Sequence, residues 1–279
     1  MPTFALSTGS LYTYGIARAF DLAAAAGFDA VEVMLDQRWD SRHPQYLRRL
    51  SETTGLPVAA VHSPFVPSVP GWPHDPQDRL RQTCALAKEL GARVVVTHLP
   101  LRIRGAKVEF FGFRPGPLLL PLPMPAPGDY GQFLLNGLAQ FEASEGVTIG
   151  VENMPCQRFL GRRLDIYALN SVANLVDLPH LTLDTTHIGT WGVDLLSTYE
   201  RLKARVVHVH LSDFDGTEHR LPEEGHLPLA EFLQGLRHDG YGGAVSLECN
   251  PVVLEAEDEG RVLAHLRKAV RFYHKHTSE

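Results

Sequence analysis

The chain has 279 residues, of which 44% are apolar, and a formal net charge of −6 at pH 7. This apolar content is enough for a buried core and excludes an intrinsically disordered protein. The acidic balance and the absence of a Lys/Arg-rich block argue against a broad nucleic-acid or membrane surface. No apolar run reaches the roughly 18 residues that a membrane span needs, so we expect none.

The N-terminal residues and the cysteines indicate a compartment. The first four residues, M-P-T-F, are not a basic segment followed by an apolar one, so we expect no signal peptide. The three cysteines, Cys84, Cys156 and Cys249, are widely spaced and odd in number. This usage argues against a disulfide framework and favours a reducing environment. We therefore predict a cytoplasmic protein.

Short β-branched runs alternate with helical patterns along the chain. The predicted strands cover residues 4–7, 29–35, 58–63, 93–98, 147–153, 180–184 with 185–187, 205–213 and 243–250. The predicted helices cover residues 16–26, 44–54, 76–90, 132–145, 165–176, 195–203, 229–238 and 257–274. Eight such units in this length predict a single-domain, closed (β/α)8 TIM barrel over residues 1–279. An open dinucleotide-binding sheet is disfavoured, because no G-x-G-x-x-G follows the first strand.

One segment, residues 101–132, interrupts this alternation. It contains the run P-L-L-L-P-L-P-M-P-A-P at residues 117–127. Proline neither continues a helix nor donates to a strand ladder, so we expect neither element throughout. The segment leaves the fourth strand at the end of the barrel where active sites lie. We predict either an ordered surface loop or a lid over the site.

Ionisable residues collect at the carboxyl ends of the predicted strands. They are His62, His98, Glu152, Asp184, His187, His210, Asp213 and Glu248. In a barrel these ends share one face, so the side chains should converge. Burying several such groups without a cation costs many kcal/mol. The set therefore predicts one or more divalent metal ions, with Zn²⁺ favoured by added histidines and Mn²⁺ or Co²⁺ by a carboxylate-rich centre.

The seventh strand, R-V-V-H-V-H-L-S-D at residues 205–213, refines this prediction. His208 and His210 alternate with valine and should share one face. His210 lies at the strand end and is the expected ligand, whereas His208 lies deeper, in a supporting layer or the core. Asp213 is expected to orient or cap a loop. Cys249 should point away from the interior, and the absence of G-x-S-x-G further disfavours a nucleophilic serine or cysteine.

Five motifs carry a resemblance to a known family. They are V-E-N-M-P (151–155), L-D-T-T-H (183–187), H-V-H-L-S-D (208–213), E-G-H-L-P-L (224–229) and S-L-E-C-N-P (246–251). The chain resembles the xylose isomerase-like barrel superfamily, which contains sugar isomerases and epimerases, inosose dehydratase and apurinic endonucleases of the endonuclease IV type. For the sugar-acting branch, the resemblance implies the metal ligands Glu152, Asp184, His210 and Glu248, with His187 against the substrate.

The endonuclease branch implies a larger ligand set and three zinc ions. Its additional ligands match His62, His98, His187 and His219 in this sequence. The aspartate of its Asp-x-His pair is Thr217 here, which puts the third metal in doubt. Asp215 or Glu218 is a candidate replacement.

We expect a sugar or sugar phosphate isomerase or epimerase that transfers a proton through a metal-bound enediolate. Glu152 and Glu248 would remove and return the proton from opposite faces of the sugar. The side chains expected to contact the small carbohydrate substrate are His187, His62, His98, His219 and Arg220. Arg220 would contact a distal hydroxyl or a phosphate.

Three competing functions fit the same residues. A zinc-dependent apurinic endonuclease would activate a hydroxide against a phosphodiester, with basic loop residues along the DNA backbone. Those loop residues are Arg102, Arg104, Lys107 and Arg114, although ordinary solvated charge explains them as well. The second function is an inosose dehydratase-like lyase, and the third is a metal-dependent binding module. The missing aspartate and the lack of a basic belt favour the isomerase or epimerase. The sequence leaves open whether the protein is a monomer or a homo-oligomer.

Overall fold

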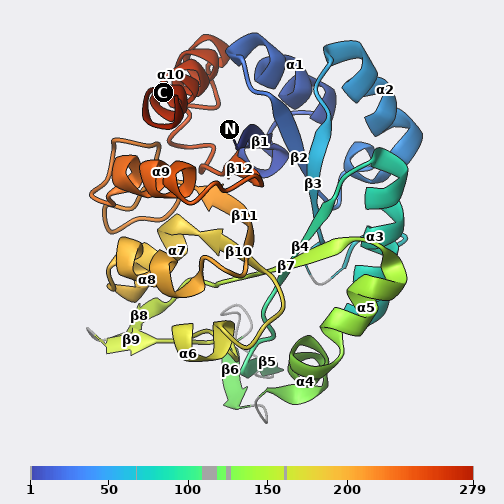
Figure 1. The fold of residues 1–279 in the computed structure, drawn as a ribbon. Coiled ribbons are helices and arrows are strands. Elements are labelled where there is room, and N and C mark those ends of the chain that lie inside the picture. Colours follow the sequence, from blue (N-terminus) through green and yellow to red (C-terminus); the bar gives the residue numbers. More distant parts are fainter. Residues whose placement is uncertain (1, 67, 109–117, 124–126, 160–161, 279) are drawn as a thin grey trace.

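The protein is described by a computed structural model that covers residues 2–66, 68–108, 118–123, 127–159 and 162–278. Eight parallel strands form a closed barrel surrounded by helices, which confirms the predicted (β/α)8 architecture (Figure 1). In order around the barrel the strands are β1 (Thr3–Ser7), β2 (Ala30–Met34), β3 (Val58–His62), β4 (Val94–His98), β7 (Thr148–Glu152), β10 (Leu181–Asp184), β11 (Val206–Leu211) and β12 (Ala244–Leu247), which pairs with β1.

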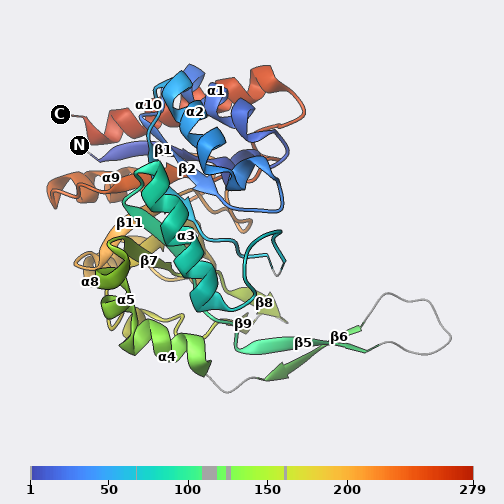
Figure 2. The same ribbon diagram turned by 90° about the vertical axis from the view of Figure 1, so that its right-hand side faces the viewer.

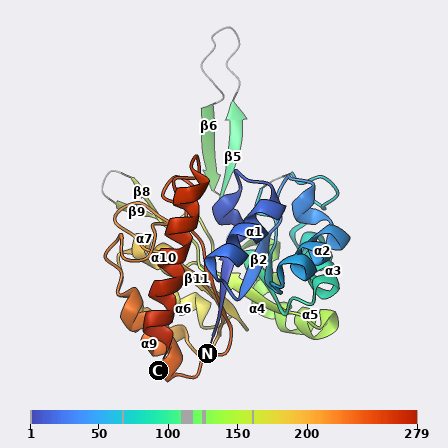
Figure 3. The same cartoon turned by 90° about the horizontal axis from the view of Figure 1, so that it is seen from above.

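The surrounding layer consists of helices that follow the strands. They are α1 (Ile16–Ala26), α2 (Pro44–Thr54), α3 (Pro76–Leu90), α4 (Gly128–Asn136), α5 (Leu138–Glu145), α6 (Val172–Leu175), α7 (Thr185–Trp191), α8 (Leu195–Leu202), α9 (Leu229–His238) and α10 (Glu259–Thr277), with short 3-10 turns at Thr8–Leu11 and Asp40–Arg42. The longest helix, α10, lies beside α1 and brings the two ends of the chain together (Figure 3). Tyr273 of α10 stacks on Phe4 with ring centroids 4.1 Å apart. Within the described residues, no helix is both long and apolar enough to span a membrane.

Alternation along the strands separates the core from the barrel interior. Val31 and Val33 of β2 belong to the buried apolar layer under the helices. Between them, Glu32 is fully buried and contacts histidines of β11 inside the barrel. Successive side chains of a strand point to opposite faces, so every second strand residue can reach the interior.

Three predicted elements differ in the structure. The helix expected at 132–145 is two helices, α4 and α5, which meet at Gly137. The helix expected at 165–176 is only the short α6, because Leu169 adopts a left-handed φ of 63° and Asn170 is held by the backbone of Met154. Residues 185–187, expected in the sixth strand, begin α7 instead. The cause is Asp184, whose carboxylate accepts a hydrogen bond from the His187 amide and caps that helix.

The proline-rich segment contains an antiparallel hairpin. Strands β5 (Ile103–Val108) and β6 (Leu118–Pro123) pair in register, with Gly105 opposite Pro121. The hairpin projects from the carboxyl-end side of the barrel (Figure 2). The segment is therefore paired in part, although not throughout. A smaller hairpin, β8 (Gln157–Phe159) with β9 (Arg162–Leu164), lies on the same side. The lid function remains a prediction, and part of the segment lies outside the described residues.

Candidate metal centre and active site

The four residues expected to bind metal lie together at the carboxyl ends of neighbouring strands. Glu152 ends β7, Asp184 ends β10, His210 belongs to β11, and Glu248 follows β12. Asp184 pairs in register with His210, which places their side chains side by side in the interior. Glu152, Asp184 and His210 are buried, and Glu248 keeps 16% of its side chain exposed.

The centre of this cluster is Nδ1 of His210. This atom lies 3.0 Å from Glu248 Oε2, 3.2 Å from Glu152 Oε1 and 3.8 Å from Asp184 Oδ2. Three carboxylates and one imidazole therefore converge on one small volume. Such a donor set suits Mn²⁺, Co²⁺ or Zn²⁺.

Two buried carboxylate oxygens support a cation at this point. Asp184 Oδ2 and Glu248 Oε2 accept no well-aligned hydrogen bond from the described residues, although Glu248 Oε2 lies 3.0 Å from His210 Nδ1. Burial raises the pKa of Asp184 to about 7. An unpartnered buried carboxylate is unfavourable, and a divalent cation would provide the missing partner. The residues therefore fit a metal ion, while their roles as ligands remain predictions.

A second cluster uses the other oxygen of Glu152. Its Oε2 lies 3.1 Å from His98 Nε2 and 3.3 Å from His62 Nε2, and the two nitrogens are 3.2 Å apart. Burial alone would lower the pKa of His62, but the hydrogen bond from its ring to Glu152 raises it. Burial lowers the pKa of His98. The cluster is polar, compact and able to take either a hydroxyl-bearing ligand or a second cation.

His187 and His219 flank Asp184 on its other side. The rings of the two histidines meet edge to face, 5.4 Å apart. His187 Nδ1 lies 2.7 Å from the carbonyl oxygen of Asn153, so it donates there and leaves Nε2 to face outward. His219 Nδ1 lies 3.2 Å from the carbonyl oxygen of Glu248. Both predicted substrate-binding histidines are therefore fixed beside the centre by backbone groups.

The loop that carries His219 also carries Asp215, Thr217, Glu218 and Arg220, which were considered above as site residues. Arg220 pairs with Asp215 at 3.2 Å, so its charge is compensated within the loop. Its contact with a distal hydroxyl or phosphate remains a prediction. Glu218 places Oε2 3.9 Å from His187 Nε2, whereas Asp215 pairs with Arg220, so Glu218 is the better candidate to replace the missing aspartate. Thr217 donates its amide to Asp215.

Asp213 is a loop-capping residue, as expected. Its buried carboxylate accepts hydrogen bonds from the amides of Phe214, Gly225 and Leu227. Cys249 packs in the apolar core, away from the interior, which confirms that expectation also. The basic residues proposed to follow DNA are less informative. Arg102 is exposed, Arg114 lies outside the described residues, and the side chains of Arg104 and Lys107 are not described either.

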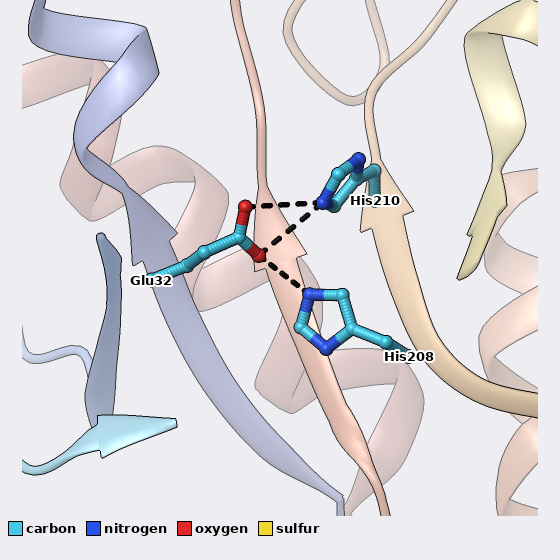
Figure 4. Close-up of side chains that lie close together, drawn as sticks. All are labelled: Glu32, His208 and His210. Carbon is cyan, nitrogen blue, oxygen red and sulfur yellow. Dashed lines mark hydrogen bonds and ion pairs between the residues drawn. The ribbon is translucent and has the colours of Figure 1, made fainter. Parts of the chain in front are cut away.

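One residue of the interior, Glu32 of β2, was not predicted from the sequence. Its carboxylate is fully buried and contacts His208 Nε2 at 2.5 Å and His210 Nε2 at 3.1 and 3.2 Å (Figure 4). The signal was present in A-V-E-V-M at residues 30–34, where one carboxylate lies in an otherwise apolar strand. Because Glu32 lies before the strand end, a search of strand ends alone does not find it.

A cavity of about 540 Å³ adjoins the second cluster. His98 lies in its wall, with Phe65, Tyr130 and Tyr167 among the aromatic residues that line it. The ring of Phe65 is 54% exposed and stacks on His98 with centroids 5.6 Å apart. The site therefore combines a polar interior with an aromatic wall, as sites for small molecules commonly do.

Comparisons with known proteins agree with this architecture. The chain is 29% identical over 266 residues to an uncharacterized protein of Mycobacterium leprae (strain TN), with 87% of each chain covered. It is similar in structure to the 3-keto-D-glucoside 4-epimerase of E. coli, at a TM-score of 0.66 and 20% identity, covering 99% of this chain and 100% of that one. A family 2 AP endonuclease of Brucella melitensis matches at a TM-score of 0.60 and 19% identity, covering 90% and 94%. These two structural likenesses show the fold.

The family follows from the sequence itself. Residues 20–269 match the family model described as a xylose isomerase-like TIM barrel. This match covers most of the chain, including all the predicted ligands. The protein therefore belongs to the xylose isomerase-like TIM barrel family.

Proposed function

We propose that the protein is a divalent-metal-dependent isomerase or epimerase of a small carbohydrate. One observation carries the proposal, namely the convergence of Glu152, Asp184 and Glu248 on Nδ1 of His210, with two buried carboxylate oxygens that accept no well-aligned hydrogen bond from the described residues. Glu152, Asp184, His210 and Glu248 would hold Mn²⁺, Co²⁺ or Zn²⁺. When bound, the ion supplies Lewis-acid polarisation of a carbonyl, which acidifies the neighbouring C–H bond.

Glu152 and Glu248 are the proposed proton carriers. Both carboxylates lie within 3.2 Å of the same imidazole nitrogen, although they come from β7 and from the end of β12. One glutamate would take the proton from carbon and the other would return it on the opposite face. His62, His98, His187 and His219 would bind hydroxyls around them. The aromatic wall at Phe65 would contact the apolar face of a sugar ring.

The proposal is tested by metal content and by proton exchange. Elemental analysis should find about one Mn²⁺, Co²⁺ or Zn²⁺ per chain. Ketoses and aldoses incubated in deuterated buffer should take up deuterium at the carbon next to the carbonyl, followed by NMR. Glu152→Gln and Glu248→Gln should each abolish this exchange. Glu142→Gln is the matched control, because Glu142 is also buried but lies on α5 and pairs with His180. Near-wild-type exchange in either site variant would show that the two-glutamate mechanism is wrong.

Phosphodiester hydrolysis is the second candidate. The observation that favours it is the cluster of His62, His98 and Glu152, which is compact enough for a second cation. Glu218 would provide a carboxylate near His187 in place of the missing aspartate. Three zinc ions per chain and cleavage of an abasic duplex would favour this function over the first. A lyase would share the same centre, and its dehydrated product would distinguish it.

A further inference from the structure

Beneath the predicted ligands lies a second layer of polar side chains. Glu32 of β2 contacts His208 of β11 across the barrel interior, and His208 in turn contacts the hydroxyl of Ser246 of β12 (Figure 4 shows Glu32 and His208 with His210). All three side chains are fully buried. His208 lies one inward position deeper than His210 on the same strand. A carboxylate at this depth is costly to bury unless it is hydrogen-bonded and its charge is compensated.

The contacts of Glu32 assign the hydrogens on both imidazoles. An ionised carboxylate only accepts hydrogen bonds, so a ring nitrogen that contacts it carries the proton. Nε2 of His210 lies 3.1 and 3.2 Å from the two Glu32 oxygens, and Nε2 of His208 lies 2.5 Å from one of them. Both histidines therefore donate from Nε2 to Glu32. By the same rule, Nδ1 of His210, which lies 3.2 Å from Glu152 and 3.0 Å from Glu248, also carries a proton when no cation is bound. A cation held by those carboxylates would displace the Nδ1 proton and leave the one on Nε2.

This assignment determines which atom of His210 faces the metal centre. With Nε2 engaged by Glu32, Nδ1 is the nitrogen directed at Glu152, Asp184 and Glu248. Rotation of the ring would break the contacts to Glu32. In proteins, a metal-binding histidine commonly donates its second N–H to a carboxylate, which fixes both tautomer and orientation.

Among the described residues, the hydrogen-bond contacts of His208 are with Glu32 and Ser246. Its Nδ1 is buried and has no hydrogen-bond partner among the described residues. Its Nε2 contacts only Glu32 and the hydroxyl of Ser246, at 2.5 and 3.2 Å. Of the two nitrogens of His208, only Nε2 therefore has partners among the described residues, and the nearer of them is the Glu32 carboxylate.

We propose that Glu32 is a positioning residue that holds His210 as the Nε2–H tautomer and so presents Nδ1 to the metal centre, and that His208 holds Glu32 in turn. The inference rests on the metal centre of the proposed function. In the proposed arrangement Glu32, His208 and His210 do not form a cation site of their own, because both Nε2 atoms donate to the carboxylate; their geometry alone would also fit a cation, and the zinc count below decides between the two.

The test compares Glu32→Gln with the control Glu142→Gln, which also removes a buried charge that pairs with a histidine. Zinc affinity is measured by competition with a chromophoric chelator. Loss of such a supporting carboxylate should weaken binding about 10- to 100-fold in Glu32→Gln. Glu142→Gln should bind zinc as the wild type does. In zinc-loaded protein labelled with ¹⁵N-histidine, NMR should show the proton of His210 on Nε2 in the wild type.

Three results would overturn the inference. One is zinc affinity in Glu32→Gln within about twofold of wild type, and another is a wild-type His210 that carries its proton on Nδ1. The third is a Glu32→Gln variant that binds one zinc ion fewer per chain than the wild type and binds the remaining zinc with wild-type affinity. That result would identify Glu32 as a metal ligand.

Additional variants protect the test against misfolding. Glu32→Asp keeps the charge with one methylene less, and His208→Gln removes the support while leaving Glu32 in place. We expect intermediate losses of zinc affinity in both. The double variant Glu32→Gln/His208→Gln should bind no more weakly than Glu32→Gln alone, because both changes act through one contact. Multiplying losses would refute the role of His208.

The outcomes separate this inference from the proposed function. A wild-type protein that binds zinc but catalyses no proton exchange would refute the function and leave the positioning role of Glu32. Unchanged zinc affinity in Glu32→Gln would refute the positioning role and leave the function. Elemental analysis that finds no metal in zinc-treated wild type would refute both.

Discussion

Replacing Asp213 should loosen the loop that brings His219 to the site. The Asp213 carboxylate is 2% exposed and accepts the amides of Phe214 (2.8 Å), Gly225 (3.0 Å) and Leu227 (3.0 Å). It thereby ties the two ends of the loop between β11 and α9. The loop approaches so closely that a Cβ on Gly225 would lie 2.4 Å from Asp213 Oδ1.

The magnitude follows from these contacts. In Asp213→Asn one oxygen becomes an amide group, so at least one buried N–H faces another donor instead of an acceptor. A hydrogen bond to a charged group contributes about 1.5–3 kcal/mol, so we expect a loss of about 2–3 kcal/mol in the free energy of unfolding. Asp213→Ala removes all three acceptor contacts and should cost about 3–5 kcal/mol.

Urea-induced unfolding in the presence of a chelator measures this loss. The control is Asp215→Asn in the same loop, since Asp215 is partly exposed and its pair with Arg220 should contribute about 1 kcal/mol or less. If the proposed function is correct, KM for the sugar should rise in Asp213→Asn while the metal content stays unchanged. Equal losses in the two variants, or a stable Asp213→Asn, would refute this reasoning.

Four further predictions concern the interior and the core. Metal affinity should fall as the pH decreases through about 7. The reason is that burial raises the pKa of Asp184 to about 7, and a protonated carboxyl does not bind a cation. Equal metal affinities at about pH 6 and about pH 8 would contradict this prediction. Without metal, the Asp184 carboxyl keeps its proton in the folded state up to about pH 7, whereas in the unfolded state its pKa is 3.8. The contribution of Asp184 to the free energy of unfolding is therefore fully present below pH 3.8 and is lost as the pH rises through about 7. Urea unfolding of chelator-treated protein at several pH values measures this loss. Gly150→Ala should destabilise by about 1–3 kcal/mol, because the new methyl would lie 2.3 Å from Thr182 Oγ1, whereas Gly242→Ala has no atom within 4 Å and should change little. Cys84 is buried with its pKa raised to about 12, so mass spectrometry should find it unmodified by an alkylating reagent in the folded protein.

The sequence was sufficient for the barrel because its strands are short, apolar and regularly spaced. It was also sufficient to bring Glu152, Asp184, His210 and Glu248 together, because parallel strands end on one face. The helical break at Gly137 was not predicted, and neither was helix α7, whose first residues 185–187 were expected in the sixth strand. Both depend on local backbone geometry and capping, which periodicity does not report.

The β5–β6 hairpin escaped prediction for a different reason. Proline lacks an amide hydrogen, and its frequency in residues 117–127 argued against a ladder. In an isolated two-stranded hairpin, the backbone N–H groups on the outer side of each strand have no partner strand, so a proline, which lacks this N–H, costs no hydrogen bond there. Pro121 and Pro123 can therefore pair with Gly105 and Ile103. Proline content thus predicted that the segment could not be paired throughout. It could not predict the pairing at 103–108 and 118–123, because that depends on whether each proline nitrogen faces the partner strand or the outside of the hairpin.

Glu152 links the predicted centre to the question of how many metals the protein binds. Its Oε1 faces His210, and its Oε2 faces His62 and His98 beside the aromatic cavity. In the proposed function, a single ion on the Oε1 side leaves the two imidazoles free to bind substrate hydroxyls. A second ion on the Oε2 side would occupy those imidazoles and favour the hydrolase. Because one carboxylate serves both clusters, metal count and reaction type should change together, which makes the number of ions per chain the most informative measurement.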